Sequence, residues 1–121
     1  MTRQLHHHVG GRPHPGGNGR FGDVYDPATG QVTARVPLAD AAEVRAAVDA
    51  AHAAFPAWAA TTPLQRARVM FRLRALIERD ADALARTITS EHGKTLSDAR
   101  GEVTRGMEVV EFASGIPHLL K

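Results

Sequence analysis

The chain has 121 residues, which is enough for one domain of ordinary size. Hydrophobic residues at 43% and charged residues at 23% are close to globular averages, and cysteine is absent, which excludes disulfides and a thiol nucleophile within this chain. The 15 Lys and Arg against 13 Asp and Glu leave a net charge of only +2, too small an excess to indicate a nucleic-acid partner. No apolar run is long enough to span a bilayer. We therefore expect a soluble, cytoplasmic protein with neither nucleic acid nor membrane as a partner.

The first third of the chain is rich in glycine and proline and predicts short strands. Residues 9–12 predict a strand, and residues 13–19 predict a loop because proline and glycine interrupt regular structure. Apolar and polar residues alternate over 31–36, which is typical of a half-buried strand. Pro27 and Gly30 suit the turn before it, so this part predicts a β-hairpin.

From Ala39 onward the apolar pattern becomes helical, and alanine is the commonest residue. Asp40 with Glu43 forms a capping-box pattern, and Pro63 suits the first position of a second helix. Gly93 is a natural stop for a third helix. Four helices are expected, beginning near Asp40, Pro63, Asp80 and Ser97, the last ending near Ser114. A core built largely of alanine buries little apolar surface, so we expect low stability for the chain alone.

The fourth predicted helix is apolar on two sides. One stripe contains Ala99, Val103, Met107 and Val110; the other, nearly opposite, contains Arg105, Val109 and Phe112. A helix with two apolar faces is normally enclosed on both. Three short helices are too few to enclose it, so we expect this sequence to be part of a larger protein.

Two glycine-containing segments imitate nucleotide-binding motifs. Residues 17–22 match G-x-G-x-x-G by letter, but prolines precede them and a β-like segment follows, whereas a dinucleotide site needs a strand before and a helix after. Gly93-Lys94-Thr95 resembles the end of a phosphate-binding loop, but the glycine required five residues earlier is Ile88. We interpret the first segment as a loop and the second as a helix stop.

Two clusters of side chains also have an ordinary interpretation. Four histidines near the N-terminus lack a fixed third ligand, which favours a solvated cluster over a metal site. Five arginines of the second predicted helix have acidic residues close behind them and no aromatic residues for base stacking, which favours a solvated face. The histidines are His6, His7, His8 and His14, and the arginines are Arg66, Arg68, Arg72, Arg74 and Arg79.

Arg105 is the one candidate binding residue. It lies on an apolar stripe, with Glu102 and Glu108 three residues to either side. One interpretation is a structural arginine that forms a salt bridge within its helix. The other is an arginine whose guanidinium points into a pocket and holds a substrate carboxylate through two hydrogen bonds. The residues alone leave both open.

Several motifs resemble the aldehyde dehydrogenase superfamily. The segments 23–38, 55–58 and 63–68 resemble its opening strands and helices, and segments 91–95, 98–113 and 115–120 resemble the CoA-acylating methylmalonate-semialdehyde, or malonate-semialdehyde, dehydrogenases. The resemblance implies an N-terminal fragment of an α/β protein, with a short β-hairpin region followed by about four α-helices. It assigns residues 1–37 to a region of oligomerisation-type strands. Residues 38–121 become an incomplete helical part of the NAD-binding domain.

In that family a cysteine thiolate attacks the aldehyde, NAD accepts hydride and coenzyme A receives the acyl group. The resemblance implies oxidation of methylmalonate or malonate semialdehyde to propanoyl- or acetyl-CoA by a homo-oligomer. It also implies that Arg105, in Gly101-Glu-Val-Thr-Arg-Gly106, binds the substrate carboxylate. The catalytic cysteine, the general base and the NAD site have no counterpart here, so the chain alone is expected to be inactive and to bind neither NAD nor coenzyme A. No metal site and no catalytic residue are expected.

Two other functions remain open. The chain could be the front end of another NAD(P)-dependent aldehyde dehydrogenase, such as one that oxidises succinate semialdehyde. It could also be a non-catalytic interaction module derived from such an enzyme.

Overall fold

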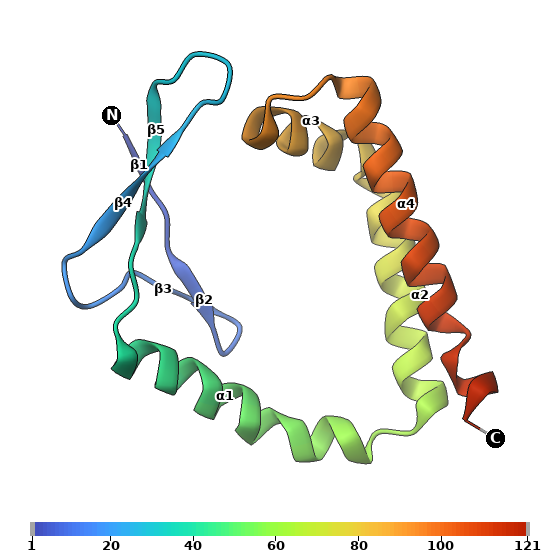
Figure 1. Ribbon diagram of the computed structural model, residues 1–121. Helices are drawn as coiled ribbons and strands as arrows, with labels where there is room; N and C mark the ends of the chain where they lie inside the picture. The colour runs from blue at the N-terminus through green and yellow to red at the C-terminus, as the bar shows by residue number, and fades with distance from the viewer. Residues whose placement is uncertain (1, 121) are drawn as a thin grey trace. The chain divides into compact units, whose positions relative to one another are not determined.

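The computed structural model describes residues 2–120, which form two compact units that divide after Ala60 (Figure 1). The first unit contains the strands and one helix, and the second contains three helices and a short 3-10 helix. This content confirms the expected α/β fragment with a short β region followed by four α-helices. The predicted boundary between an oligomerisation region, residues 1–37, and part of an NAD-binding domain, residues 38–121, concerns the complete enzyme and stays a prediction.

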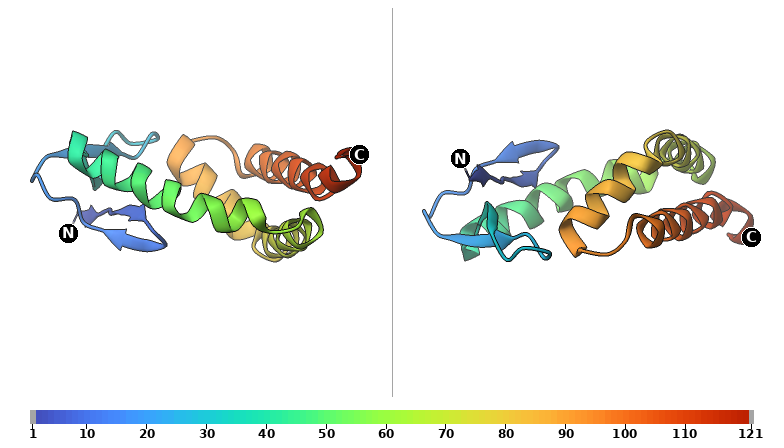
Figure 2. Two further views of the ribbon diagram at one scale, coloured as in Figure 1. Left: turned by 90° about the horizontal axis from the view of Figure 1, so that it is seen from below. Right: turned by 90° about the horizontal axis from the view of Figure 1, so that it is seen from above.

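The first unit holds two separate pieces of sheet (Figure 2). Strand β5 (Val32–Pro37) lies between β1 (Arg3–Gln4), to which it is parallel, and β4 (Phe21–Tyr25), to which it is antiparallel. The β4–β5 pair is the predicted hairpin. At its turn the Asp26 carboxylate accepts hydrogen bonds from the N–H groups of Ala28 and Thr29, and Gly30 has a φ of 72°.

The second piece of sheet shows where the first predicted strand was misplaced. Strands β2 (His7–Val9) and β3 (Arg12–His14) pair in antiparallel fashion, so residues 9–12 are the tip of a hairpin rather than one strand. Gly10 and Gly11, at the turn, have φ values of 59° and 78°. Two consecutive positive φ angles define the tight hairpin turn that glycine accommodates without strain.

Helix α1 (Ala41–Ala60) begins at the predicted capping box. The Asp40 carboxylate accepts hydrogen bonds from the N–H groups of Ala42 and Glu43, and the Glu43 carboxylate accepts one from the Asp40 N–H at 3.0 Å. Glu43 also accepts a hydrogen bond from the Gly17 N–H at 2.6 Å and one from the Asn18 side chain at 3.3 Å. One carboxylate therefore caps the helix and ties down the glycine-rich loop.

In the second unit, α2 (Pro63–Arg79) and α4 (Leu96–Ser114) lie side by side in opposite directions. Helix α3 (Ala81–His92) connects them and packs on α4, and the 3-10 helix η1 (Ile116–Leu119) follows α4. Thr62 caps α2 by accepting a hydrogen bond from the Gln65 N–H, and Gly93 ends α3 with a φ of 81°. Both features confirm the predicted boundaries.

The N-cap of α4 lies two residues before the predicted one. Thr95, not Ser97, is the N-cap residue: its hydroxyl accepts a hydrogen bond from the Asp98 N–H at 3.2 Å. Both residues have a suitable hydroxyl. The helix begins at Leu96, so Ser97 lies inside it, whereas Thr95 directly precedes it, as an N-cap residue must.

The core of the described residues is made of alanine. The buried apolar residues are Ala34, Ala67, Ala85 and Ala99, and no large side chain is fully buried. The accessible surface is 9020 Å², whereas two separate domains of about 60 residues would together expose about 7,600 Å². The expectation of a thin core is confirmed. None of the helices in residues 2–120 has the length and hydropathy needed to cross a membrane.

Candidate functional site

The candidate site is the outward face of α4, which contains Arg105, Val109 and Phe112. These positions are one and two helical turns apart and therefore share a face. Val109 is 67% exposed and Phe112 is 69% exposed, whereas Ala99, on the other stripe, is fully buried. Only one of the two apolar stripes of α4 is covered within its own unit: α2 and α3 pack on that stripe, and nothing else described in residues 61–120 covers the other.

Arg105 is exposed on that face. Within residues 2–120 its guanidinium makes neither a hydrogen bond nor an ion pair. The structure therefore does not show the salt-bridged arginine that was one interpretation of the sequence. A charged fork beside Val109 and Phe112 is left with all its donors available.

Glu102, one of the two acidic residues nearest to Arg105 along the helix, has another partner. The Glu102 carboxylate forms an ion pair with the Lys94 ammonium, and the Lys94 side chain is only 18% exposed. This hydrogen bond is the largest of the effects that hold the pKa of Glu102 below its ordinary value; Arg105 contributes the smallest one. The charge of Glu102 is thus balanced mainly by Lys94.

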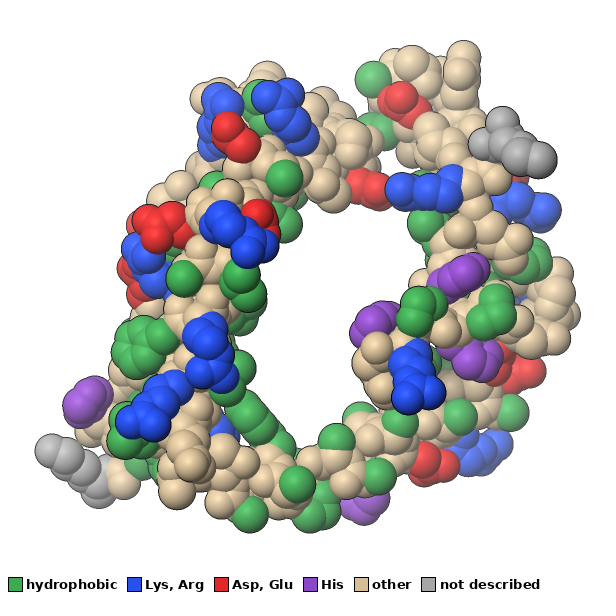
Figure 3. Space-filling model, turned by 180° about the vertical axis from the view of Figure 1, so that it is seen from behind, with side chains coloured by type: hydrophobic (Ala, Val, Ile, Leu, Met, Phe, Trp, Pro, Cys, Tyr) green, Lys and Arg blue, Asp and Glu red, His purple; other side chains and the backbone are tan. Residues whose placement is uncertain are grey.

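Other charged residues of the second unit pair with one another. Arg74 contacts Glu78 at 2.6 Å and Glu111 at 2.7 Å, so it joins α2 to α4, and these two partners raise its pKa. Arg100 contacts Asp82 at 3.0 Å and joins α4 to α3. Arginine side chains and exposed hydrophobic side chains alternate along the surface of these helices (Figure 3). Arg74 and Arg100 therefore act as links between helices.

The surroundings of Arg105 suit a small carboxylate. A guanidinium presents parallel N–H donors that match the two oxygens of a carboxylate, and such charge-assisted pairs are stronger than neutral hydrogen bonds. An apolar surface beside the pair strengthens it further once water is excluded. Val109 and Phe112 provide that apolar surface. This arrangement can hold an anion and can orient what is attached to it, but it contains no nucleophile.

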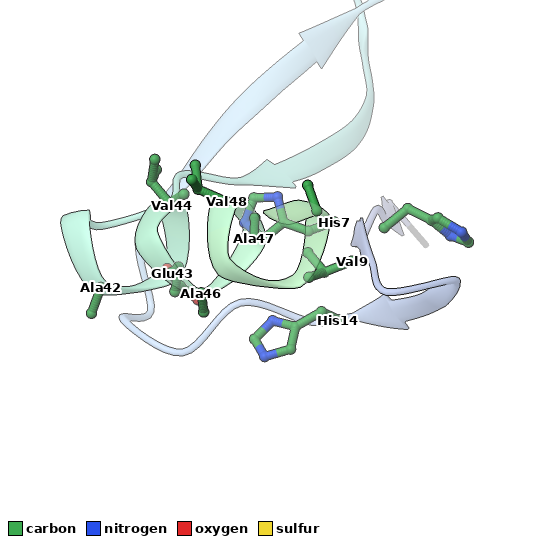
Figure 4. Close-up of a pocket in the computed structure, with 12 residues that line it drawn as sticks. His7, Val9, His14, Ala42, Glu43, Val44, Ala46, Ala47 and Val48 are labelled. Carbon is green, nitrogen blue, oxygen red and sulfur yellow. The ribbon is translucent and has the colours of Figure 1, made fainter. Parts of the chain in front are cut away.

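The sequence did not predict a cavity that lies within the first unit. It has a volume of about 690 Å³ and lies between the β2–β3 hairpin and α1 (Figure 4). Its lining is mostly alanine and valine, with His7, His14 and Glu43 among the polar groups. Both oxygens of Glu43 already accept hydrogen bonds, and Nε2 of His7 is buried without a partner. Alanine-rich segments carry no pattern that reveals such a space.

The histidines do not converge on one point. His7 and His14 are opposite each other in the β2–β3 pair, and the Nδ1 atom of His14 accepts a hydrogen bond from the Gly16 N–H at 3.3 Å. Among residues 2–120 no group of three His, Cys, Asp or Glu side chains is placed to hold a metal ion.

The glycine segment 17–22 does not fit a dinucleotide. Gly22 already belongs to strand β4, so no helix begins where this segment ends, and the neighbouring N-terminus of α1 is already capped by the carboxylates of Asp40 and Glu43. A pyrophosphate needs a free helix N-terminus. Gly93 and Thr95 are the C-cap of α3 and the N-cap of α4, as the helix-stop interpretation requires.

Lys94 is the residue of this site whose role the sequence did not reveal. It stands in a segment that imitates a phosphate-binding loop, and its true partner, Glu102, is eight residues further along the chain. The signal that could have found it is the sharp turn at Gly93, which directs residue 94 back toward the first turns of the next helix.

The family profile described as aldehyde dehydrogenase family matches residues 15–121. The chain is 47% identical, over 117 residues, to the malonate-semialdehyde dehydrogenase of Pseudomonas aeruginosa. The matched region covers 97% of this chain and 23% of that protein. The crystal structure of the methylmalonate-semialdehyde dehydrogenase DddC of Oceanimonas doudoroffii superposes with a TM-score of 0.92 at 46% identity, over 100% of this chain and 24% of that one.

A structure from Sinorhizobium meliloti, assigned as a methylmalonate-semialdehyde dehydrogenase and complexed with NAD, gives a TM-score of 0.94 at 45% identity, over 100% of this chain and 25% of that one. The chain thus spans about a quarter of the length of the relatives that it matches. Because the family profile covers most of the sequence and three relatives agree in sequence or in fold, the chain belongs to the aldehyde dehydrogenase family.

Proposed function

We propose that this chain is the N-terminal part of an NAD-dependent, CoA-acylating methylmalonate- or malonate-semialdehyde dehydrogenase, in which Arg105 binds the substrate carboxylate. The observation that carries the proposal is the free guanidinium of Arg105 on an uncovered apolar face. The relatives are named as dehydrogenases of semialdehydes that bear a carboxylate, which supports it.

The chemistry of the substrate explains why an arginine is useful there. Malonate semialdehyde carries an aldehyde at one end and a planar anion at the other. A guanidinium that holds the anion through two hydrogen bonds fixes the direction of the carbonyl. Correct orientation of two reacting groups is a large contribution to catalysis. In this proposal Arg105 binds and orients, and it takes part in no bond-making step.

The remaining parts of the reaction belong to chain outside this sequence. The 121 residues contain no cysteine, so the thiolate nucleophile of the family must come from elsewhere. The same is proposed for the general base, for the NAD site and for the coenzyme A site. The uncovered stripe with Val109 and Phe112 then packs against that additional chain or borders the substrate pocket. A homo-oligomer in the cytoplasm is part of the same proposal.

The proposal is tested with a chimaera in which this chain replaces the corresponding quarter of the Pseudomonas aeruginosa relative. We expect NAD reduction with malonate semialdehyde and coenzyme A, with acetyl-CoA and carbon dioxide as products. Propanal, which has no carboxylate, should be the poorer substrate. The 121-residue chain alone is the control and should be inactive. A chimaera that folds and prefers propanal, or that releases only a free acid, contradicts the proposal.

A further inference from the structure

We propose that Lys94 is a positioning residue, which keeps Arg105 available for the substrate by holding the carboxylate of Glu102 away from it. This inference rests on the proposed function, because it concerns the same arginine. It adds a residue that touches neither substrate nor cofactor and acts on Arg105 through Glu102.

Glu102 is a close neighbour of Arg105 on α4. It precedes Arg105 by three residues, and side chains three residues apart on a helix are neighbours. Opposite charges at this spacing form ion pairs readily. A Glu102 without another partner would therefore compete with any substrate carboxylate for the guanidinium.

An ion pair with Lys94 prevents this competition. The Lys94 ammonium pairs with Oε1 of Glu102. Lys94 follows Gly93, whose φ of 81° turns the chain between α3 and α4, and its side chain is the less exposed of the pair, at 18% against 40%. Because the Lys94 side chain is already restricted by its surroundings, it loses little further conformational entropy when it pairs with Glu102.

Arg105 itself has no charged partner among the described residues. In residues 2–120 it makes no hydrogen bond or ion pair although Glu102 and Glu108 stand one turn away on either side. Lys94 also lowers the pKa of Glu102 more than Arg105 does. Neither acidic neighbour thus binds the guanidinium, and for Glu102 the reason is its ion pair with Lys94.

The kinetic test uses the chimaera described above. Lys94→Met frees Glu102 and should raise the KM for malonate semialdehyde about fivefold, the upper range for an exposed ion pair, with kcat and the activity on propanal unchanged. Glu102→Gln breaks the same ion pair without freeing a carboxylate, so it should leave KM unchanged. The double variant Lys94→Met/Glu102→Gln should return KM to within about twofold of the starting value.

A merely structural role of the Lys94–Glu102 pair predicts a different pattern. All three variants would then lose the same contact and would show the same change, with no rescue by the second substitution. Equal effects of Lys94→Met and Glu102→Gln, or no effect of Lys94→Met, overturn the proposal. Arg105→Leu separates this from failure of the proposed function: if Arg105→Leu leaves carboxylate preference intact, Arg105 is not the carboxylate-binding residue at all.

A second readout uses the 121-residue chain itself and needs no catalysis. Nuclear magnetic resonance follows the exchange of the Arg105 Nε–H proton with water. We expect the exchange to slow about twofold or more in Lys94→Met, where Glu102 takes up the guanidinium, and to stay unchanged in Glu102→Gln. Unchanged exchange in Lys94→Met shows that Glu102 does not turn to Arg105 and overturns the proposal.

Discussion

The two neighbouring valines Val109 and Val110 provide a matched test of which face of α4 is covered. Val109 lies on the stripe with Arg105 and is 67% exposed, whereas Val110 lies on the opposite stripe and is partly buried. Both are interior positions of the same helix, so a change to alanine alters helix propensity equally at the two sites. Any difference between Val109→Ala and Val110→Ala therefore reports packing.

The magnitude follows from the exposed fractions. Removing two methyl-sized groups from full burial costs about 1.6 kcal/mol. About a third of Val109 is out of water, so its loss is about 0.5 kcal/mol, and the better helix propensity of alanine offsets about the same amount. We expect Val109→Ala to change stability by about zero. Val110→Ala loses most of the packing term and leaves a small cavity, so we expect about 1 kcal/mol of destabilisation.

The assay is urea unfolding of the 121-residue chain, followed by the helical circular dichroism signal, with both variants measured beside the parent chain. A cost for Val109→Ala equal to or larger than that for Val110→Ala would refute the reasoning, because it would mean that the second stripe is packed in this chain. In the chimaera, where additional chain is proposed to cover this face, Val109→Ala should become destabilising by about 1 kcal/mol as well.

Three further predictions concern the chain itself. Thr95→Ala removes the cap of α4 and should cost about 1 kcal/mol in urea unfolding, whereas Ser97→Ala, two residues later, should cost nearly nothing. The pKa of Glu102 in the folded state is below its ordinary value of 4.5, so its ion pair contributes stability above pH 4.5, and this contribution is lost as the pH falls through the folded-state pKa. Glu102→Gln should therefore flatten the dependence of unfolding free energy on pH on the acid side. An unchanged slope would contradict this. Glu43→Ala leaves the Gly17 N–H without its acceptor and should cost about 1–2 kcal/mol, with Asp49→Ala as the exposed acidic control on the same helix; equal losses would show that the loop contact is unimportant.

Helix boundaries were the most predictable part of the fold, because they depend on local chemistry. The capping box at Asp40 and the proline at residue 63 were found from sequence, since each satisfies its own backbone groups within one turn. The tight turn at Gly10 and Gly11 was missed, because two glycines allow many conformations and only the pairing of β2 with β3 selects this one.

The candidate site was predictable in its residue and not in its electrostatics. Arg105 was identified from its stripe and from family resemblance, but whether it pairs with Glu102 depends on where another helix ends. The position of Lys94 is set by the turn at Gly93, a tertiary feature with no periodic signature. The cavity beside His7 was missed for a similar reason: alanines that line a space and alanines that fill a core have the same pattern.

The most direct test of the account is the substrate preference of Arg105→Leu in the chimaera. A bidentate arginine–carboxylate pair lost from an enclosed site costs about 2–5 kcal/mol, so we expect kcat/KM for malonate semialdehyde to fall about 100-fold relative to that for propanal. Arg105→Lys, which keeps the charge but not the two-donor geometry, should fall in between. Equal losses on both substrates would show that Arg105 supports the structure rather than the carboxylate, and would contradict the central claim.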